Sequence, residues 1–352
     1  MRSPLPPPGM PAAERPFRRT PLRVVGFGSP IVDLFARVDD AFLRSSVPGS
    51  KGGMEPLGER ELDAVVARLP ERPVLSAGGA AANTVAALGR AGAEISFFGR
   101  LGDDEAGEFF LRRWRAAGGG DAEFIRVPGR ATARCLLLVT PDAERTMRSS
   151  LGVSLEFAPE EIAAVDFGRF DLLYVEGFMV YASRWRDVIA AARAAGCRIA
   201  FDLASFEIAG KFRNGFDELL RGGMIDFLFA NGEEAAALTG EKQPEAALRK
   251  IARHAEYAAV KVGADGAWIA RRGELFRVAA RPVTDPVDTT GAGDLWAAGF
   301  LTGWSCGEPP ERAGEYGAIF AGEVVRHRGA DMDDAAWRRI AAEVAALTKK
   351  ER

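Results

Sequence analysis

The stretch Val287–Phe300 reads VDTTGAGDLWAAGF and runs from an extended, β-branched segment into an apolar helical pattern. Gly291, Ala292 and Gly293 carry almost no side chain, so a ligand can approach their backbone N–H groups closely. Those N–H groups fall where a helix begins, with unpaired donors and the positive end of the helix dipole pointing outward. The stretch therefore predicts an anion site, for which phosphate is the usual ligand.

Asp294 is unexpected in this stretch, because a carboxylate inside an anion cradle repels a phosphate. A chemical role explains it, since Asp294 can act as a base that takes a proton from a hydroxyl attacking the phosphorus. The alternative is a glycine-rich turn in which Asp294 is an ordinary acidic residue of a first helical turn. Local physics leaves both interpretations open.

The amino-acid composition and net charge limit the classes of binding partner that we expect. Hydrophobic residues make up 47% of the 352 residues and charged residues 27%, which suits a sizeable core in a globular protein. Lys and Arg total 46 against 49 Asp and Glu, a net charge of -3, so no basic excess favours nucleic acid as a partner. No run approaches the ~20 apolar residues that cross a bilayer, so we expect no membrane segment.

The cysteines and residues 1–20 indicate the cellular compartment in which we expect the protein. Cys135, Cys197 and Cys306 are odd in number and far apart, with no zinc or disulfide spacing, which favours a reducing cytoplasm. The two histidines are too few for a metal cluster. Residues 1–20 are rich in proline and arginine and lack an apolar stretch, so they are predicted to be a disordered tail and not a secretory signal.

From residue 171 onward, short apolar runs alternate with helical stretches. The runs cover residues 171–175, 198–202 and 227–230. Strands that are apolar throughout are typical of a parallel sheet covered by helices on both faces. Ligands bind at the carboxyl ends of such strands, where Asp202, Asn231 and Gly263 fall.

Two further patterns concern the first half of the chain. Alternating residues at 34–38 and a hairpin pattern at 133–139 and 144–148 predict a second, small sheet. Asp103 is predicted to cap the helix that follows the strand around Phe97.

The stretch Asp288–Leu301 resembles the C-terminal signature of the PfkB (ribokinase-like) carbohydrate and nucleoside kinases at every defined position. Gly78, Gly79 and Asn83 resemble its N-terminal signature, with Val85 standing where that signature has a small residue. Residues 132–135 and 139–147 are more similar to the bacterial adenosine-kinase-like branch than to ribokinases proper.

The resemblance implies a ribokinase-like three-layer α/β/α fold, with a mainly parallel central sheet and a small β-sheet lid. The kinase domain would cover residues 21–352, with a lid at about 34–57 and 121–150. By resemblance, Asp294 is the catalytic base, and the amides of Gly291, Ala292, Gly293 and Asp294 form the anion hole.

The resemblance also implies two sets of binding residues. Those for the substrate are Ser29, Asp33, Gly52, Gly53, Gly78, Gly79, Asn83 and Asp294. Those for ATP are Asn231, Lys261, Gly263, Gly266, Thr290, Gly291, Gly293, Gly317 and Ala318. Gly317 and Ala318 have an alternative, because packing between helices also calls for small residues.

The same family resemblance implies binding sites for metal ions. Asn231 and Glu234 match an N-x-x-E motif that positions Mg²⁺ mainly through water, which suits an ion that prefers oxygen and keeps its waters. Their alternative is a capping box, since Asn followed three residues later by Glu is a helix-start pattern. Asp288 and Thr290 match positions that bind a monovalent cation, usually K⁺, in some members.

The sequence thus predicts an ATP-dependent kinase that phosphorylates a primary hydroxyl, without a P-loop. The favoured acceptor is the 5′-hydroxyl of adenosine, and the alternative is a free sugar such as ribose, fructose or a keto-sugar acid. A non-catalytic sugar- or nucleotide-binding regulator is a third hypothesis, against which Asp294 argues because binding needs no base. Both a monomer and a homodimer are compatible with the sequence.

Overall fold

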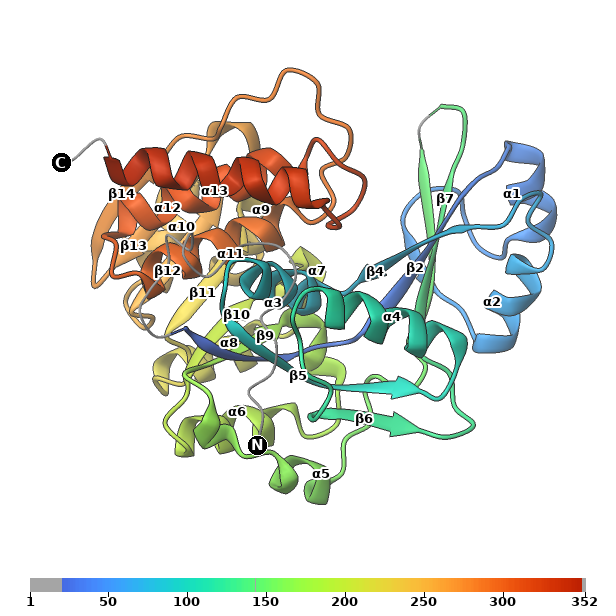
Figure 1. Ribbon diagram of the computed structural model, residues 1–352, viewed down its shortest axis with the longest axis horizontal. Coiled ribbons are helices and arrows are strands. Elements are labelled where there is room, and N and C mark those ends of the chain that lie inside the picture. Colours follow the sequence, from blue (N-terminus) through green and yellow to red (C-terminus); the bar gives the residue numbers. More distant parts are fainter. Residues whose placement is uncertain (1–20, 143, 350–352) are drawn as a thin grey trace.

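The computed structural model describes residues 21–142 and 144–349, so the predicted tail at 1–20 lies outside the described residues. The described chain forms two sheets (Figure 1). The large sheet has nine strands in the order β14-β13-β12-β11-β10-β9-β1-β5-β6, and the small sheet has five in the order β3-β8-β7-β2-β4. No described helix has the length and apolar character needed to cross a membrane.

The large sheet is mainly parallel, as predicted. Its strands are β1 (Arg23–Phe27), β5 (Glu94–Gly102), β6 (Phe124–Val127), β9 (Leu172–Glu176), β10 (Arg198–Asp202), β11 (Phe227–Asn231), β12 (Tyr257–Lys261), β13 (Ala267–Arg271) and β14 (Glu274–Val278). The neighbours from β12 through β6 pair in parallel, while β13 runs antiparallel to both β12 and β14.

Helices cover both faces of the large sheet. One face carries α3 (Ala80–Arg90), α4 (Glu105–Ala116), α11 (Ala292–Ser305), α12 (Pro310–Val324) and α13 (Asp334–Lys349). The other carries α5 (Pro159–Ala164), α6 (Trp185–Ala194), α7 (Phe206–Lys211), α8 (Arg213–Arg221), α9 (Gly232–Thr239) and α10 (Pro244–Ile251). Short 3₁₀ helices are η2 (Phe167–Arg169), η3 (Gly177–Tyr181) and η4 (Gly263–Asp265).

Successive residues of the central strands pack into these two layers in turn. In β9, Leu172 and Tyr174 join the core under α3 and α11, whereas Leu173 and Val175 join the core over α6. Because both faces are buried, the strand reads as an unbroken apolar run. The predicted three-layer α/β/α fold is confirmed.

The small sheet projects to one side of these layers (Figure 1). Its strands are β2 (Ile31–Arg37), β3 (Met54–Pro56), β4 (Val74–Gly78), β7 (Ala133–Val139) and β8 (Arg145–Ser150), and α1 (Asp40–Ser46) and α2 (Glu59–Val66) accompany them. Leu34 and Leu136 are buried on the face that joins Leu43 of α1 and Leu62 of α2 in one core. The opposite face, with Asp33, carries the alternate residues.

The bounds of the small sheet differ from those expected of the lid. β6 falls inside the expected range 121–150 but pairs with β5 of the large sheet. β4 falls outside the expected ranges and pairs with β2. Partner choice between strands is a long-range property that the alternation within one strand does not encode.

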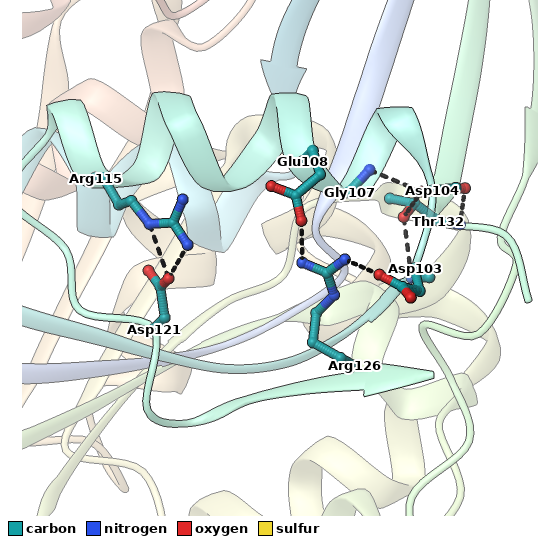
Figure 2. Close-up of polar contacts among 9 residues, drawn as sticks. Asp103, Asp104, Gly107, Glu108, Arg115, Asp121, Arg126 and Thr132 are labelled. Atoms are coloured by element: carbon teal, nitrogen blue, oxygen red, sulfur yellow. Dashed lines mark hydrogen bonds and ion pairs between the residues drawn. The ribbon is translucent and has the colours of Figure 1, made fainter. Parts of the chain in front are cut away.

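Helix α4 begins one residue later than predicted, with Asp104 as its cap in place of Asp103. Asp104 Oδ1 accepts from the Gly107 amide at 2.8 Å and from the Thr132 hydroxyl at 2.6 Å, and Oδ2 accepts from the Thr132 amide at 2.8 Å (Figure 2). Asp103 pairs with Arg126 at 2.5 Å. Thr132 precedes β7, and its bonds to Asp104 select the cap by tying α4 to the entrance of the small sheet.

Helices α11 and α12 approach closely because small residues face each other. A methyl group at Gly299 would lie 2.5 Å from the carbonyl oxygen of Tyr316, and one at Gly317 would lie 2.8 Å from the Trp296 ring. Ala318 is buried on the same helix. Helix packing therefore accounts for Gly317 without a nucleotide, and the contact of Gly317 and Ala318 with ATP stays a prediction.

We expect Gly299→Ala to lower the free energy of unfolding by about 1–3 kcal/mol, because the new methyl group would meet backbone atoms that cannot rotate away. Gly210→Ala in α7 is the matched control. There a methyl group would lie 3.9 Å from Ala237 Cβ, so the better helix propensity of alanine should add up to about 1 kcal/mol. Urea unfolding of both variants measures the difference, and equal shifts would contradict close packing at Gly299.

Candidate active site

The order of the large sheet reverses at β1, which pairs with β5 on one side and with β9 on the other. Ligands of open α/β sheets bind at the carboxyl ends of the strands beside such a reversal. Ser29 follows β1 and Glu176 ends β9, while Asp202 and Asn231 end β10 and β11. Polar groups from four strands therefore meet along one edge.

Asp294 lies in the first turn of α11, where α3 packs beside it. The amide nitrogen Nδ2 of Asn83 donates to Asp294 Oδ2 at 2.9 Å, and the Thr84 hydroxyl donates to the Asp294 carbonyl at 3.2 Å. The structure thus brings together two predicted site residues that are 211 positions apart. Burial raises the pKa of Asp294 to about 6, although the Asn83 bond opposes the rise. A carboxyl with a pKa of about 6 suits the predicted role of Asp294 as a base, which stays a prediction.

The cradle before Asp294 depends on two glycines. Gly291 has φ 79°, in the left-handed region that favours glycine, and a methyl group there would lie 2.8 Å from Ala330 Cβ. A methyl group at Gly293 would lie 3.1 Å from Lys261 Nζ. The Ala292 amide donates to the Thr289 carbonyl at 3.2 Å. The neighbouring amides of the first turn lie too early in the helix to have an acceptor four residues back within it.

A partly buried ammonium lies next to this cradle. Lys261 Nζ donates to Asp202 Oδ2 at 2.8 Å, and Asp202 is 3% exposed. The Tyr174 hydroxyl donates to the same oxygen at 3.4 Å. Burial lowers the pKa of Lys261, but the attraction of Asp202 and Glu234 outweighs it, so the ammonium stays charged. The sequence places Asp202 at the end of a strand. Its pairing with Lys261 could not be predicted, because the two residues are 59 positions apart and no local pattern links them.

Asn231 and Glu234 form the capping box that was the alternative to a metal site. Asn231 Oδ1 accepts from the Glu234 amide at 2.9 Å, and Glu234 accepts from the Asn231 amide and side chain at 2.8 Å each. Burial and the carboxylate of Asp202 raise the pKa of Glu234 to about 7. Both Glu234 oxygens are engaged inside this capping box, so any Mg²⁺ would have to be held through water, and the metal role of the pair stays a prediction. Among the described residues, no three or more His, Cys, Asp or Glu gather as ligands.

A cavity of about 450 Å³ opens between α9 and the turn after β12. It is lined by Asn231, Gly232, Glu233, Ala236, Lys242, Lys261, Val262 and Gly263. Three of the predicted ATP-binding residues, Asn231, Lys261 and Gly263, therefore line one cavity. Lys242 also lines it and was not predicted from the sequence. Gly266 has φ 93°, and a methyl group there would lie 2.0 Å from the Val278 carbonyl oxygen, so the turn itself requires glycine.

Arg145 of β8 reaches from the small sheet to the loop before α11. Its Nη2 donates to Asp288 Oδ1 at 2.9 Å and its Nη1 to the Thr290 hydroxyl at 3.2 Å. Asp288 also accepts from the Thr290 amide at 3.0 Å and from the Gly329 amide at 3.0 Å. These bonds outweigh burial and lower the pKa of Asp288 to about 2. The two residues predicted to bind a monovalent cation thus face a guanidinium.

Asp33 lies on the face of the small sheet that α1 and α2 leave uncovered. Burial raises its pKa to about 7. The register places Phe35, Cys135, Leu137 and Met147 on the same face. This face therefore combines one carboxyl with apolar side chains.

The predicted substrate glycines fall in two places. A methyl group at Gly78 would lie 2.5 Å from Asp33 Oδ2, and Gly79, with φ 99°, lies against the Ser29 carbonyl. The Gly52 amide donates to the Thr146 hydroxyl at 2.9 Å, and the Met147 amide donates to the Gly53 carbonyl at 2.9 Å. Gly78 and Gly79 are therefore at the crevice, whereas Gly52 and Gly53 extend the small sheet beside β8.

We expect Asp294→Asn to raise the free energy of unfolding by about 1–3 kcal/mol at pH 8. The pKa of the folded carboxyl is about 6 against an ordinary 3.8, so the native state binds more protons and its ionised form is the costly one. The advantage of asparagine should shrink as pH falls from about 6 towards 3.8, where the wild-type carboxyl protonates. Urea unfolding at pH 8, 6 and 5 checks the sign, and a gain that persists unchanged at pH 5 would contradict it.

The fold and this edge define a class of protein. A carboxyl in the first turn of a helix, near the carboxyl edge of a ribokinase-like α/β sheet, is an arrangement suited to a phosphotransferase that acts on hydroxyl groups. The model of the pfkB family of carbohydrate kinases matches residues 57–336. The chain belongs to the PfkB family, whose kinases act on sugars or nucleosides with ATP and usually Mg²⁺.

Relatives show the breadth of this family. The chain is 34% identical to an ATP-dependent ribose-1-phosphate kinase of Halopiger xanaduensis, over 70% of this chain and 81% of that protein. It resembles the crystal structure of adenosine kinase from Sinorhizobium meliloti at 32% identity and TM-score 0.80, covering 93% of this chain and 100% of the other. A probable sugar kinase from Rhizobium etli is similar at 31% identity and TM-score 0.81, covering 93% and 99%.

Proposed function

We propose that this kinase transfers the γ-phosphate of ATP to a primary hydroxyl, with the 5′-hydroxyl of adenosine as the favoured acceptor. The observation that carries the proposal is the 2.9 Å bond from Asn83 to Asp294 at the mouth of the cradle. It places a predicted hydroxyl-binding amide directly beside the predicted base.

In this proposal, Asp294 accepts the proton of the attacking hydroxyl, and its pKa of about 6 keeps it ionised at neutral pH. The outward amides of Gly291, Gly293 and Asp294 stabilise the charge that develops on the transferred phosphoryl group. Lys261, beneath Gly293, adds positive charge from the protein side. Mg²⁺ held through water near Asn231 and Glu234 would neutralise the phosphates of ATP.

The inner face of the small sheet supports a nucleoside as acceptor. Phe35, Leu137 and Met147 are half-buried there and offer an apolar surface suited to a base, while Asp33 offers a hydroxyl-binding carboxyl. A free sugar would leave that apolar surface without a partner. The similarity to an adenosine kinase structure at 32% identity points the same way.

A sugar kinase is the second candidate. The identity of 34% to a ribose-1-phosphate kinase favours it, because that relative is as similar to this chain as the adenosine kinase is. Both candidates share the phosphoryl-transfer edge of the large sheet and differ in what the small sheet must hold.

We further propose that the small sheet is a lid over the acceptor. Arg145 crosses from the small sheet to Asp288, and Arg328 crosses the other way to lie 5.9 Å from the centre of the Phe35 ring. These contacts join the two sheets across the crevice. Asp288 and Thr290 stay the proposed ligands of K⁺, in exchange with the guanidinium of Arg145.

The test of the function is ADP release from ATP and Mg²⁺ with adenosine, other nucleosides, ribose, fructose and keto-sugar acids. We expect the highest kcat/KM with adenosine, falling as pH drops through about 6 because Asp294 protonates. Asp294→Asn should lose ~10²–10⁴-fold in kcat while the protein stays folded. Preference for a free sugar would replace the favoured acceptor by the second candidate, and near-normal turnover by Asp294→Asn would remove the mechanism.

The lid is tested by Arg145→Gln. We expect the acceptor KM to rise about threefold to tenfold, since a lost ion pair near the surface is worth about 1 kcal/mol and each 1.4 kcal/mol is tenfold. Arg126→Gln is the matched control, because Arg126 also bridges two segments by pairing with Asp103 and Glu108 (Figure 2). Arg126 belongs to β6, the edge strand of the large sheet, and makes no ion pair with the described residues of the loop before α11. Steady-state kinetics that respond equally to both substitutions would contradict a lid contact.

A further inference from the structure

Glu176 is a carboxylate buried at the carboxyl edge of the large sheet, and the chemistry above gives it no task. It ends β9, beside the point where the strand order reverses, and is 2% exposed. Its Oε1 accepts from the Ser29 amide at 2.8 Å, and its Oε2 accepts from the Ala81 amide at 2.8 Å. Each oxygen thus binds backbone from a different segment.

The two segments are those assigned to the acceptor. Ser29 belongs to the loop from β1 to β2, which leads to Asp33. Ala81 is the second residue of α3, and two residues further on Asn83 donates to Asp294 at 2.9 Å. One carboxylate therefore sets the spacing between the Asp33 loop and the helix that carries Asn83.

The segments close tightly around this carboxylate. A methyl group at Gly28 would lie 3.0 Å from the Glu176 carboxyl and 2.8 Å from Ala81 Cβ. Gly79 has φ 99°, and a methyl group there would lie 2.4 Å from the Ser29 carbonyl oxygen. Glycine on both sides lets the loop and the helix meet over Glu176 with no intervening side chain.

The burial of a polar side chain at position 176 argues for a task beyond packing. Burial raises its pKa to about 7, against the bonds from Ala81 and Ser29, so holding an ionised carboxyl here destabilises the fold. An apolar side chain would fill the same space without that penalty. The helix N-terminus at Ala81 favours a negative charge, which fits an acceptor of N–H bonds in particular.

We propose that Glu176 is a positioning residue for the acceptor, holding the Ser29 loop and the first turn of α3 in register so that Asp33 and Asn83 grip one substrate. The inference rests on the proposed kinase function. It assigns to Glu176 no contact with the substrate and no proton transfer.

Glu176→Gln tests the inference with little change in volume. The glutamine side chain keeps one oxygen as a hydrogen-bond acceptor, but its NH₂ group faces the second backbone N–H and cannot accept from it. Either the Ser29 loop or the first turn of α3 therefore loses its hydrogen bond to residue 176. We expect the acceptor KM to rise on the order of tenfold and kcat to fall, because Asn83 orients Asp294. The KM for ATP should stay within about twofold, since the nucleotide cavity lies at α9 and β12.

Asp226→Asn is the matched control. Asp226 Oδ2 likewise accepts a backbone amide, that of Ile199 at 2.7 Å, but at the opposite edge of the same sheet. We expect it to leave both KM values unchanged. Gly28→Ala is a second variant that disturbs the same contact while keeping the carboxylate, and it should reproduce the rise in acceptor KM if Glu176→Gln does not fold.

The outcomes separate the two claims. A wild-type enzyme that phosphorylates no acceptor of the panel would sink the proposed function and this inference with it. An active wild type whose Glu176→Gln and Gly28→Ala variants keep the acceptor KM would overturn the inference alone. Parallel rises in the KM of acceptor and ATP would overturn it too, because they would mark a general loss of structure.

Discussion

Charge at the carboxyl edge of the large sheet is the constraint on which the rest of the structure depends. The carboxyls of Asp202, Glu234 and Asp294 act there on one partly buried ammonium, that of Lys261, and the Glu176 carboxyl interacts with those of Asp202 and Asp294. Removing several carboxylates from water is costly unless each finds donors. Glu176 takes two backbone amides, Glu234 closes a capping box and Asp202 takes Lys261. Among the described residues, Asn83 is the one side-chain donor that bonds the Asp294 carboxyl, which suits the proposed role of Asp294 as a base.

The need of each buried carboxylate for hydrogen-bond donors also explains how the two sheets are joined. Asp288 collects the Thr290 and Gly329 amides, which fixes the loop before the cradle, and then also receives Arg145 from the small sheet. At the other side of the small sheet, Asp104 receives Thr132 at the entrance of β7. Contacts from the cradle loop and from α4 thus meet the two ends of the β7–β8 hairpin.

Much of this arrangement could be predicted from the sequence because its signals are local. The apolar runs of β9, β10 and β11 and the glycines before Asp294 indicate their structures within a few residues. The pairings of Glu176 with Ser29 and of Arg145 with Asp288 span 147 and 143 positions and leave no local pattern. The sequence favoured Asp103 as the cap of α4, whereas the structure has Asp104. The hydrogen bonds to Thr132 that distinguish the two come from a residue 28 positions away, which no local pattern indicates.

The division of labour between the sheets explains why one family serves many acceptors. In the proposed mechanism, the large sheet and its helices supply the base, the cradle and the ammonium, which act on the phosphoryl group and require of the acceptor only its hydroxyl. The small sheet presents side chains with a period of two, so exchanging Phe35, Leu137 or Met147 alters the acceptor surface without touching a residue of the large sheet. Glu176 stands between these roles, because its carboxylate holds the segments that carry Asp33 and Asn83 at a fixed separation. On the proposed function, the acceptor's hydroxyl must fit that separation, whereas the rest of the acceptor need match only the small sheet.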